Sequence, residues 1–304
     1  MESTADTSHL LSFLLAGKSV RGVILDGTIL VQEMQDRHAL ASLETLILGQ
    51  ALQVIVLMAS TLKSHDKIDL RIDCSGPVKG LVAEATATGE VRGYLKQVPV
   101  PLKGPLETFD EAAKLTPCWG DGCLTINRYL GEGRQPFSGT ITLQSGNMAS
   151  ELARYYLLSE QIPTAIHLSL SFDIHGRING AGGLLIQALP GASEEIMTGL
   201  EQRTNALPSL GKALADGQEI APWLSRHFSP FSPEILEERP VHFRCRCNVK
   251  RMRLLFLHLP LADIMEMRDN GPFPIKLHCH FCNGQYLFEQ KSLAEICLEK
   301  QSLT

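Results

Sequence analysis

Four cysteines in two close pairs constrain this chain more than any other feature of its sequence. The first pair is Cys245-Arg-Cys247 and the second is Cys279-His-Phe-Cys282. Two thiolates from each pair would complete the ligand set of a tetrahedral Zn²⁺ site. We therefore predict that Cys245, Cys247, Cys279 and Cys282 bind one zinc ion per chain.

The first pair has an unusual spacing, because ordinary zinc ribbons use Cys-x-x-Cys twice. Apolar and polar residues alternate from Val241 to the first cysteine, which predicts a strand. Residues two apart in a strand point to the same face. We therefore expect the strand to continue through Cys247 and to present both sulfurs to one ion.

A cluster of thiolates has two interpretations that the spacing alone leaves open. The site can be a structural zinc site that permanently stabilises the fold. It can also be a redox switch, since an oxidant converts thiolates to disulfides and releases the metal. A thioredoxin-type oxidoreductase fits less well, because no βαβ pattern surrounds Cys279. Four histidines lie nearby, and with four cysteines in place we expect them to face solvent: His242, His258, His278 and His280.

Composition describes an ordinary soluble globular protein. The chain has 304 residues, of which 44% are hydrophobic and 20% charged, so it is long enough for more than one domain. Its net charge of -5 argues against a surface dedicated to nucleic acid. Arg244 to Arg253 is nevertheless rich in cations, and this stretch supports a second hypothesis, a zinc-dependent RNA-binding or ribosome-associated factor.

The cysteine content and the N-terminus both favour a reducing, cytoplasmic setting. Eight cysteines are too few for a disulfide scaffold, and no basic segment precedes Leu10 as it would in a signal peptide. The longest apolar run, Leu46 to Leu62, is interrupted by Gly49 and two glutamines. We interpret it as a buried core helix rather than a membrane span.

Hydrophobic periodicity predicts an α+β core domain over residues 1–189. Apolar residues alternate with charged ones from Ile68 to Cys74, which indicates a half-buried strand. A second alternation runs from Ile166 to Ile174 and places His167 on its polar, solvent-facing side. The turn at Asp26-Gly27 is expected to join two strands. Further strands are predicted at 80–86, 90–96, 123–129, 137–144 and 184–189, with helices at 40–62 and 147–161.

The remaining sequence divides into a linker and a small C-terminal domain. Residues 190–240 have helical spacing but are interrupted by prolines, so we expect a metastable linker. Residues 241–304 are expected to form the zinc-binding domain, with helices near 252–259 and 261–268 and a last helix from Ser292. We expect the other four cysteines to be incidental thiols: Cys74, Cys118, Cys123 and Cys297.

The sequence contains no recognisable enzyme motif. The glycines between Gly176 and Gly183 are not followed by the Gly-Lys-Ser/Thr of a phosphate-binding loop. No Ser/His/Asp arrangement has a recognisable local context. We therefore predict that the protein is not an enzyme.

Several segments in order resemble one known family, the redox-regulated heat-shock chaperones called 33 kDa chaperonins. The Cys-x-Cys followed at a distance by Cys-x-x-Cys is the most specific of them. Together they span nearly the whole chain: Val20–Gly22, Leu46–Gln50, Ser159–Pro163, Gly180–Gln187, Val241–Cys247 and His278–Cys282 with Tyr286 and Phe288. The basic residues after Cys247 depart from the family pattern.

The resemblance implies an ATP-independent holdase that binds unfolded or partly folded client proteins and performs no chemistry on them. In this family the four thiolates hold Zn²⁺ in a reduced, inactive form. Oxidation pairs Cys245 with Cys247 and Cys279 with Cys282, and the metal leaves. The zinc domain and the linker then unfold, hydrophobic surface becomes exposed, and the active form tends to form a homodimer. Neither a membrane nor a nucleic acid is expected among its partners.

Overall fold

The structure, a computed structural model, describes residues 7–101, 115–131 and 135–302. The chain forms two compact units, with the boundary between Arg244 and Cys245. Each unit has a hydrophobic core of its own. Sheets and helices are present in both, which confirms the α+β class predicted from the sequence.

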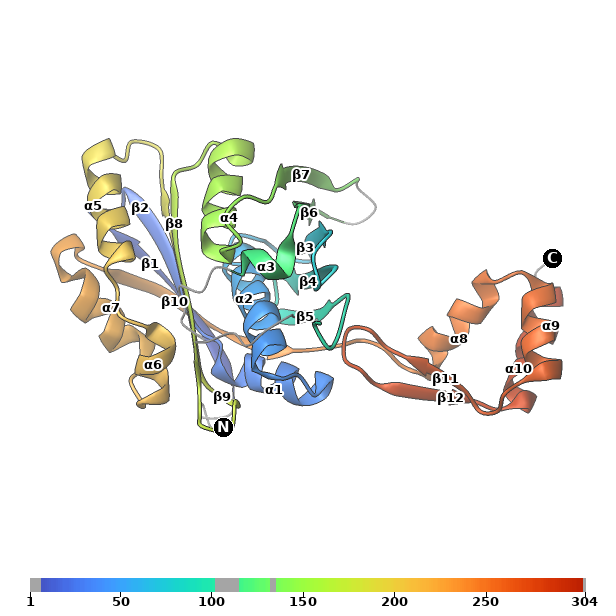
Figure 1. Cartoon of the computed structure of the whole chain (residues 1–304). Coiled ribbons are helices and arrows are strands. Elements are labelled where there is room, and N and C mark those ends of the chain that lie inside the picture. The colour runs from blue at the N-terminus through green and yellow to red at the C-terminus, as the bar shows by residue number, and fades with distance from the viewer. Residues whose placement is uncertain (1–6, 102–114, 132–134, 303–304) are drawn as a thin grey trace. The chain divides into compact units, whose positions relative to one another are not determined.

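Ten strands and a set of helices build the described part of the larger unit (Figure 1). The strands are β1 (Ser8–Leu15), β2 (Val20–Asp26), β3 (Lys67–Cys74), β4 (Gly80–Thr86), β5 (Glu90–Leu95), β6 (Gly122–Tyr129), β7 (Phe137–Thr142), β8 (Thr164–Phe172), β9 (Ile178–Ala188) and β10 (Glu234–Phe243). The helices are α1 (Thr28–His38), α2 (Ser42–Ala59), α3 (Thr116–Trp119), α4 (Met148–Tyr155), α5 (Glu194–Asn205), α6 (Leu210–Ala215) and α7 (Ile220–Phe228), with the short helices η2 (Tyr156–Glu160) and η3 (Ser229–Phe231).

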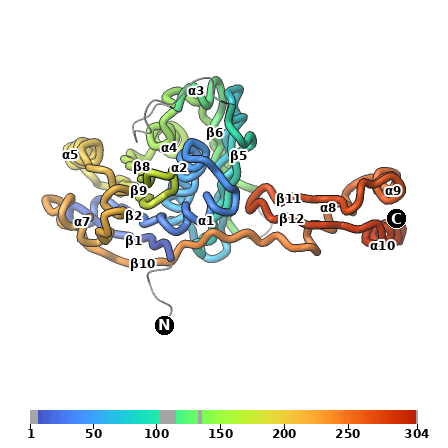
Figure 2. The backbone as a smooth tube through the Cα atoms, turned by 60° about the horizontal axis from the view of Figure 1, so that its bottom comes forward, coloured from blue at the N-terminus to red at the C-terminus, as the bar shows by residue number. Residues whose placement is uncertain are grey.

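The strands form one mixed sheet in the order β7-β6-β3-β4-β5-β10-β1-β2-β9-β8. β10 therefore lies inside the sheet, although it comes from the part of the sequence predicted to be linker. It runs antiparallel to β1 along most of its length (Figure 2). It meets β5 in parallel through only two pairs, His242 with Glu90 and Phe243 with Val91.

Helix α2 is the centre of the core. Its residues from Glu44 to Ala59 are all buried, and it packs against strands from both halves of the sheet. Composition and length alone would allow this helix to cross a membrane, but 89% of its most apolar window is buried inside the unit. The prediction of a buried core helix at this position is therefore confirmed.

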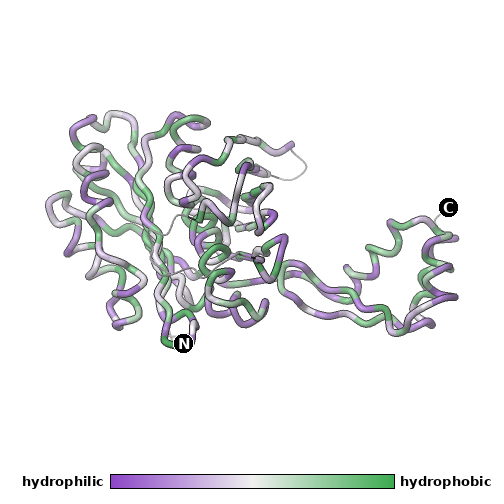
Figure 3. The backbone as a smooth tube through the Cα atoms, in the orientation of Figure 1, coloured by the Kyte–Doolittle hydropathy of each residue, from purple (hydrophilic) through white to green (hydrophobic). Residues whose placement is uncertain are grey.

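Helices α5, α6 and α7 cover one face of the strands β10-β1-β2-β9-β8, and α1, α2 and α4 lie on the other (Figure 1). The three covering helices alternate hydrophobic and hydrophilic residues, as an amphipathic segment must (Figure 3). Pro208 lies between α5 and α6, and Pro222 lies in the first turn of α7. The side chains that fix them to the sheet are fully buried: Leu200, Leu210, Trp223, Leu224 and Phe228.

Two local predictions for the larger unit are wrong. No second strand follows Asp26-Gly27, because α1 begins at Thr28, whose N–H donates to Asp26 Oδ1 at 3.0 Å. The buried residues of α1 follow helical spacing, but this spacing is not visible in the few residues next to the turn from which the strand is predicted. His167 is half-buried rather than on a solvent-facing side: Leu168, the next residue of β8, faces α2, so His167 lies on the opposite face, toward the covering helices.

The smaller unit is built around a hairpin and three helices. Its elements are α8 (Val249–His258), α9 (Leu261–Asn270), β11 (Ile275–His278), β12 (Gln285–Phe288) and α10 (Gln290–Ser302). The rings of Phe256 and Phe288 meet edge to face at 4.9 Å between centroids. Ile264, Leu293, Ile296 and Cys297 complete a small buried core.

Candidate metal centre

The four paired cysteines lie on two loops of the smaller unit. Cys245 and Cys247 belong to irregular chain between β10 and α8, while Cys279 and Cys282 lie in the turn between β11 and β12. The prediction that the first pair extends a strand is wrong, because β10 ends at Phe243. Free of a sheet ladder, the Cys-x-Cys backbone can bend so that both sulfurs turn to the same side.

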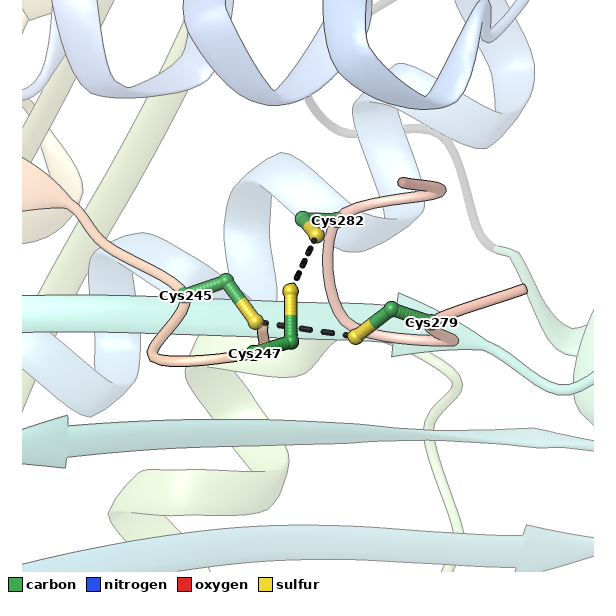
Figure 4. Close-up of side chains that lie close together, drawn as sticks. All are labelled: Cys245, Cys247, Cys279 and Cys282. Carbon is green, nitrogen blue, oxygen red and sulfur yellow. Dashed lines mark hydrogen bonds between the residues drawn. The ribbon is translucent and has the colours of Figure 1, made fainter. Parts of the chain in front are cut away.

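The sulfurs of these cysteines converge on one point (Figure 4). All four Sγ atoms lie within 4.8 Å of one another. Cys245 Sγ is 3.6 Å from Cys279 Sγ, and Cys247 Sγ is 3.2 Å from Cys282 Sγ. Four sulfurs around a zinc ion at about 2.3 Å would be about 3.8 Å apart. The sulfur cluster therefore has the dimensions of a tetrahedral thiolate site.

A tight turn holds the second pair in place. The N–H of Cys279 donates to the carbonyl of Gly284 at 2.9 Å, and the N–H of Asn283 donates to the carbonyl of Cys279 at 2.8 Å. Asn283 has a φ of 55°, in the left-handed region where asparagine is better tolerated than most residues. The turn reverses the chain between β11 and β12, so that the sulfurs of Cys279 and Cys282 point to one side.

Hydrogen bonding favours one thiolate in the cluster and burial disfavours others. Burial opposes ionisation of Cys247, but the hydroxyl of Tyr286 donates to Cys247 Sγ at 3.0 Å, and with the neighbouring thiols it lowers the pKa of Cys247 to about 7. Burial raises the pKa of Cys279 to about 11 and also raises that of Cys282. The hydrogen bond to Cys247 raises the pKa of Tyr286.

These groups fit a zinc ion by their chemistry. Four soft sulfur donors from two loops match the donor set of a structural zinc site. Because two of the thiols resist ionisation by themselves, a divalent cation is needed to hold four thiolates together, and its binding would release protons. Tyr286 of β12 donates a hydrogen bond to Cys247 Sγ, and the spacing of the cysteines does not predict this contact.

The other cysteines take no part in this cluster within the described residues. Cys74 ends β3, Cys118 is buried in α3, Cys123 is exposed on β6, and Cys297 is buried in α10. The four neighbouring histidines also lie outside the group of four ligands.

Comparison with known proteins gives one consistent result. The family model described as Hsp33 protein matches residues 8–289. The chain is similar to the 33 kDa chaperonin of Levilactobacillus brevis, at 32% identity over 97% of this chain and 99% of that protein. It is 36% identical to the 33 kDa chaperonin of Carboxydothermus hydrogenoformans, over 92% and 95% of the two chains. The crystal structure of the 33 kDa chaperonin (heat shock protein 33 homolog) from Thermotoga maritima superposes with a TM-score of 0.84, at 30% identity, covering 97% of this chain and 99% of that one.

Proposed function

Because this chain belongs to the Hsp33 family of chaperones, we propose that it is a redox-regulated holdase whose activity is set by the four clustered thiols. It would bind unfolded or partly folded proteins in the cytoplasm without ATP and without chemistry on them. The observation that carries the proposal is the convergence of four sulfurs within 4.8 Å in a small unit. Such a cluster is both a metal site and an oxidisable site.

In the reduced form Cys245, Cys247, Cys279 and Cys282 would hold Zn²⁺. When bound, the ion would supply a crosslink between the loop before α8 and the turn of the hairpin. One peroxide would take two electrons from each pair of thiolates and two protons from solvent, so that an S–S bond forms and the peroxide becomes two waters. The sulfurs lose their negative charge in this reaction and no longer serve as zinc ligands.

The surface that binds clients would be the face of the sheet beneath α5, α6 and α7. This face is hydrophobic, and the buried residues of the three helices would become exposed with it. Ile196, Leu207 and Phe231 pack at the rim of the same cluster. The three helices have only 12, 6 and 9 residues, so their docking depends on tertiary contacts rather than on intrinsic helix stability.

Strand β10 would transmit the change from one unit to the other. It joins α7 and η3 to the first ligand, Cys245. Its C-terminal end is held by the two pairs with β5, by the ion pair of Arg244 with Glu90 at 3.1 Å between the charged atoms, and by the buried ring of Phe243 against α1. We propose that loss of the smaller unit would let the chain after Phe243 pull on this end of β10 and loosen the helices that precede the strand.

Oxidation is expected to give the disulfides Cys245–Cys247 and Cys279–Cys282. Contacts across the two pairs also bring sulfurs within reach, at 3.6 and 3.2 Å. Once the unit has opened, however, closing a loop of three or four residues costs about 2 kcal/mol less entropy than closing a loop of more than thirty. Peptide mapping of peroxide-treated protein, with zinc release followed in the same samples, checks this. Dominant crosslinks between the pairs would show a different switch.

The holdase function is tested by suppression of aggregation of a chemically unfolded client. Oxidised protein is expected to suppress aggregation at a few chains per client, and reduced zinc-loaded protein is expected to be inactive. Oxidised Cys123→Ser, which removes an exposed thiol of the larger unit, should behave as the unaltered protein. Equal activity in both redox states would contradict redox control. Salt-sensitive binding of RNA by the reduced protein, without client protection, would support the RNA-binding alternative instead.

A further inference from the structure

His167 lies on the face of the sheet that α5 and α6 cover. Along one row of the sheet His167 is paired with Leu184, Leu184 with Ile24, and Ile24 with Leu11. Paired residues in neighbouring antiparallel strands share a face. Leu11, Ile24 and Leu184 belong to the cluster that the covering helices bury, so His167 occupies the fourth position of a hydrophobic row.

The two helices approach His167 from either side. One row away, the N–H of Gly211 at the start of α6 donates to Ser169 Oγ at 2.7 Å. One row away in the other direction, Ala165 lines a cavity together with Met197 and Thr198 of α5. His167 therefore lies beneath the junction of α5 and α6.

The imidazole of His167 lacks a hydrogen bond at one of its nitrogens within the described residues. His167 as a whole is half-buried, but its Nε2 atom is buried and has no hydrogen-bond partner among these residues. A buried nitrogen without a partner costs free energy even when neutral, and a buried cation without a partner costs far more. Burial alone lowers the pKa of His167 to about 4, from 6.5.

No charged group compensates for the burial. The charged residues of the covering helices are Glu194, Glu195, Glu201 and Arg203 on α5, Lys212 on α6 and Arg226 on α7, while β9 carries none. Of these, only Arg203 is not exposed, and its Nε donates to the carbonyl of His227 at 2.6 Å. Glu44, Glu151 and Arg154 belong to α2 and α4, which pack on the other side of β8. Burial is the one cause of the His167 shift.

We propose that His167 is a proton-binding group that releases α5 and α6 from the sheet under mildly acidic conditions, without oxidation of the cysteines. The docked helices favour the neutral ring, and the undocked state allows the charged ring to reach water. Docking is therefore strongest above the pKa of a free histidine and weakens as the pH falls from about 6.5 toward 4. The inference rests on the proposed function in one respect, that the uncovered face binds clients.

The size of the effect follows from the two pKa values. With a pKa of about 4 when docked and 6.5 when undocked, the opening constant of the helices should rise about 20- to 30-fold between pH 7.5 and pH 5. A second histidine, His227 on α7, contacts Trp223 at 4.5 Å between ring centroids, and burial followed by two arginines lowers its pKa as well. His227 would act in the same direction but more weakly, because it is less buried.

Hydrogen exchange of residues 194–215 in the full, reduced, zinc-loaded chain tests the proposal, with rates corrected for the intrinsic effect of pH. The unaltered protein and the surface control His65→Leu should open 20- to 30-fold more at pH 5, whereas His167→Leu should change by less than about fivefold. His167→Gln, which is polar but cannot be charged, should behave like His167→Leu. Zinc content is measured in every sample.

Two outcomes would overturn the proposal. One is equal opening in unaltered protein and both His167 variants, which would assign any acid effect to the thiolate site or to other groups. The other is a ring of His167 that titrates near 6.5 while α5 and α6 stay protected, which would show that the side chain reaches water by rotating at the edge of the sheet. If α5 and α6 open at low pH as expected but the protein does not protect clients, the role of His167 is supported and the proposal that this face binds clients is contradicted.

Discussion

Removing the metal from the reduced chain is expected to unfold the smaller unit and to leave strands β1 to β9 of the larger unit folded. The smaller unit, Cys245–Thr304, has a core of only six buried residues. A native unit of about this size has a total stability of about 3–9 kcal/mol. A structural zinc site contributes about 10–16 kcal/mol of apparent binding free energy at neutral pH. Zinc binding would therefore exceed the total stability of the unit, so the metal-free unit is expected to unfold.

Chelation followed by limited proteolysis checks this prediction, and new cleavage should be confined to the region after Pro190. Two substitutions in the same unit form a matched pair. Cys247→Ser removes a ligand and should mimic chelation. Cys297→Ala removes a buried thiol outside the cluster, so it should cost about 1–2 kcal/mol and keep the zinc. Full protection of α8 and α10 in zinc-free protein would show that the metal is not what holds this unit together.

Trp223→Ala is expected to make the reduced, zinc-loaded protein an active holdase. Trp223 is fully buried in the cluster between α7 and the sheet. Truncating a buried tryptophan costs about 3–5 kcal/mol, which should raise the undocked fraction of the helices by about 10²- to 5 × 10³-fold. The substitution bypasses the thiols, so activity should appear without oxidant and without zinc release.

Aggregation assays of the reduced variant, with proteolysis of residues 194–228 in parallel, measure both consequences. Phe231→Ala is the matched control, because Phe231 packs at the rim of the same cluster and is only half-buried. It should change the undocked fraction by less than about tenfold. A Trp223→Ala protein with open helices and no holding activity would show that clients bind elsewhere.

The sequence predicts most elements of this fold because their periodicity is local. The alternation from Ile68 to Cys74 appears as β3, and the apolar run after Leu46 appears as the buried helix α2. Spacing alone also singles out the four paired cysteines, and the structure brings their sulfurs together. These features depend on residues a few positions apart, which is the range over which sequence patterns act.

The features that the sequence does not predict depend on distant partners. His167 looks solvent-facing in the alternation of its own strand, and it is half-buried because the helices from residues 194–215 cover that face of β8. The Cys-x-Cys loop leaves the strand after Phe243, and its sulfurs turn instead to those of Cys279 and Cys282, more than thirty residues away. The position of β10 inside the sheet likewise follows from pairing with β1, which lies more than two hundred residues away.

The interior position of β10 has a consequence for what the protein becomes when that strand leaves. Without it the sheet falls into two parts, β7-β6-β3-β4-β5 and β1-β2-β9-β8, which no other strand joins within the described residues. Each part would then present an open edge, along β5 and along β1, with unpaired backbone donors and acceptors. An open edge pairs with any extended chain, whether a client or a second copy. Self-association and client capture would then compete for the same edges, so the activity of the opened protein would depend on its own concentration.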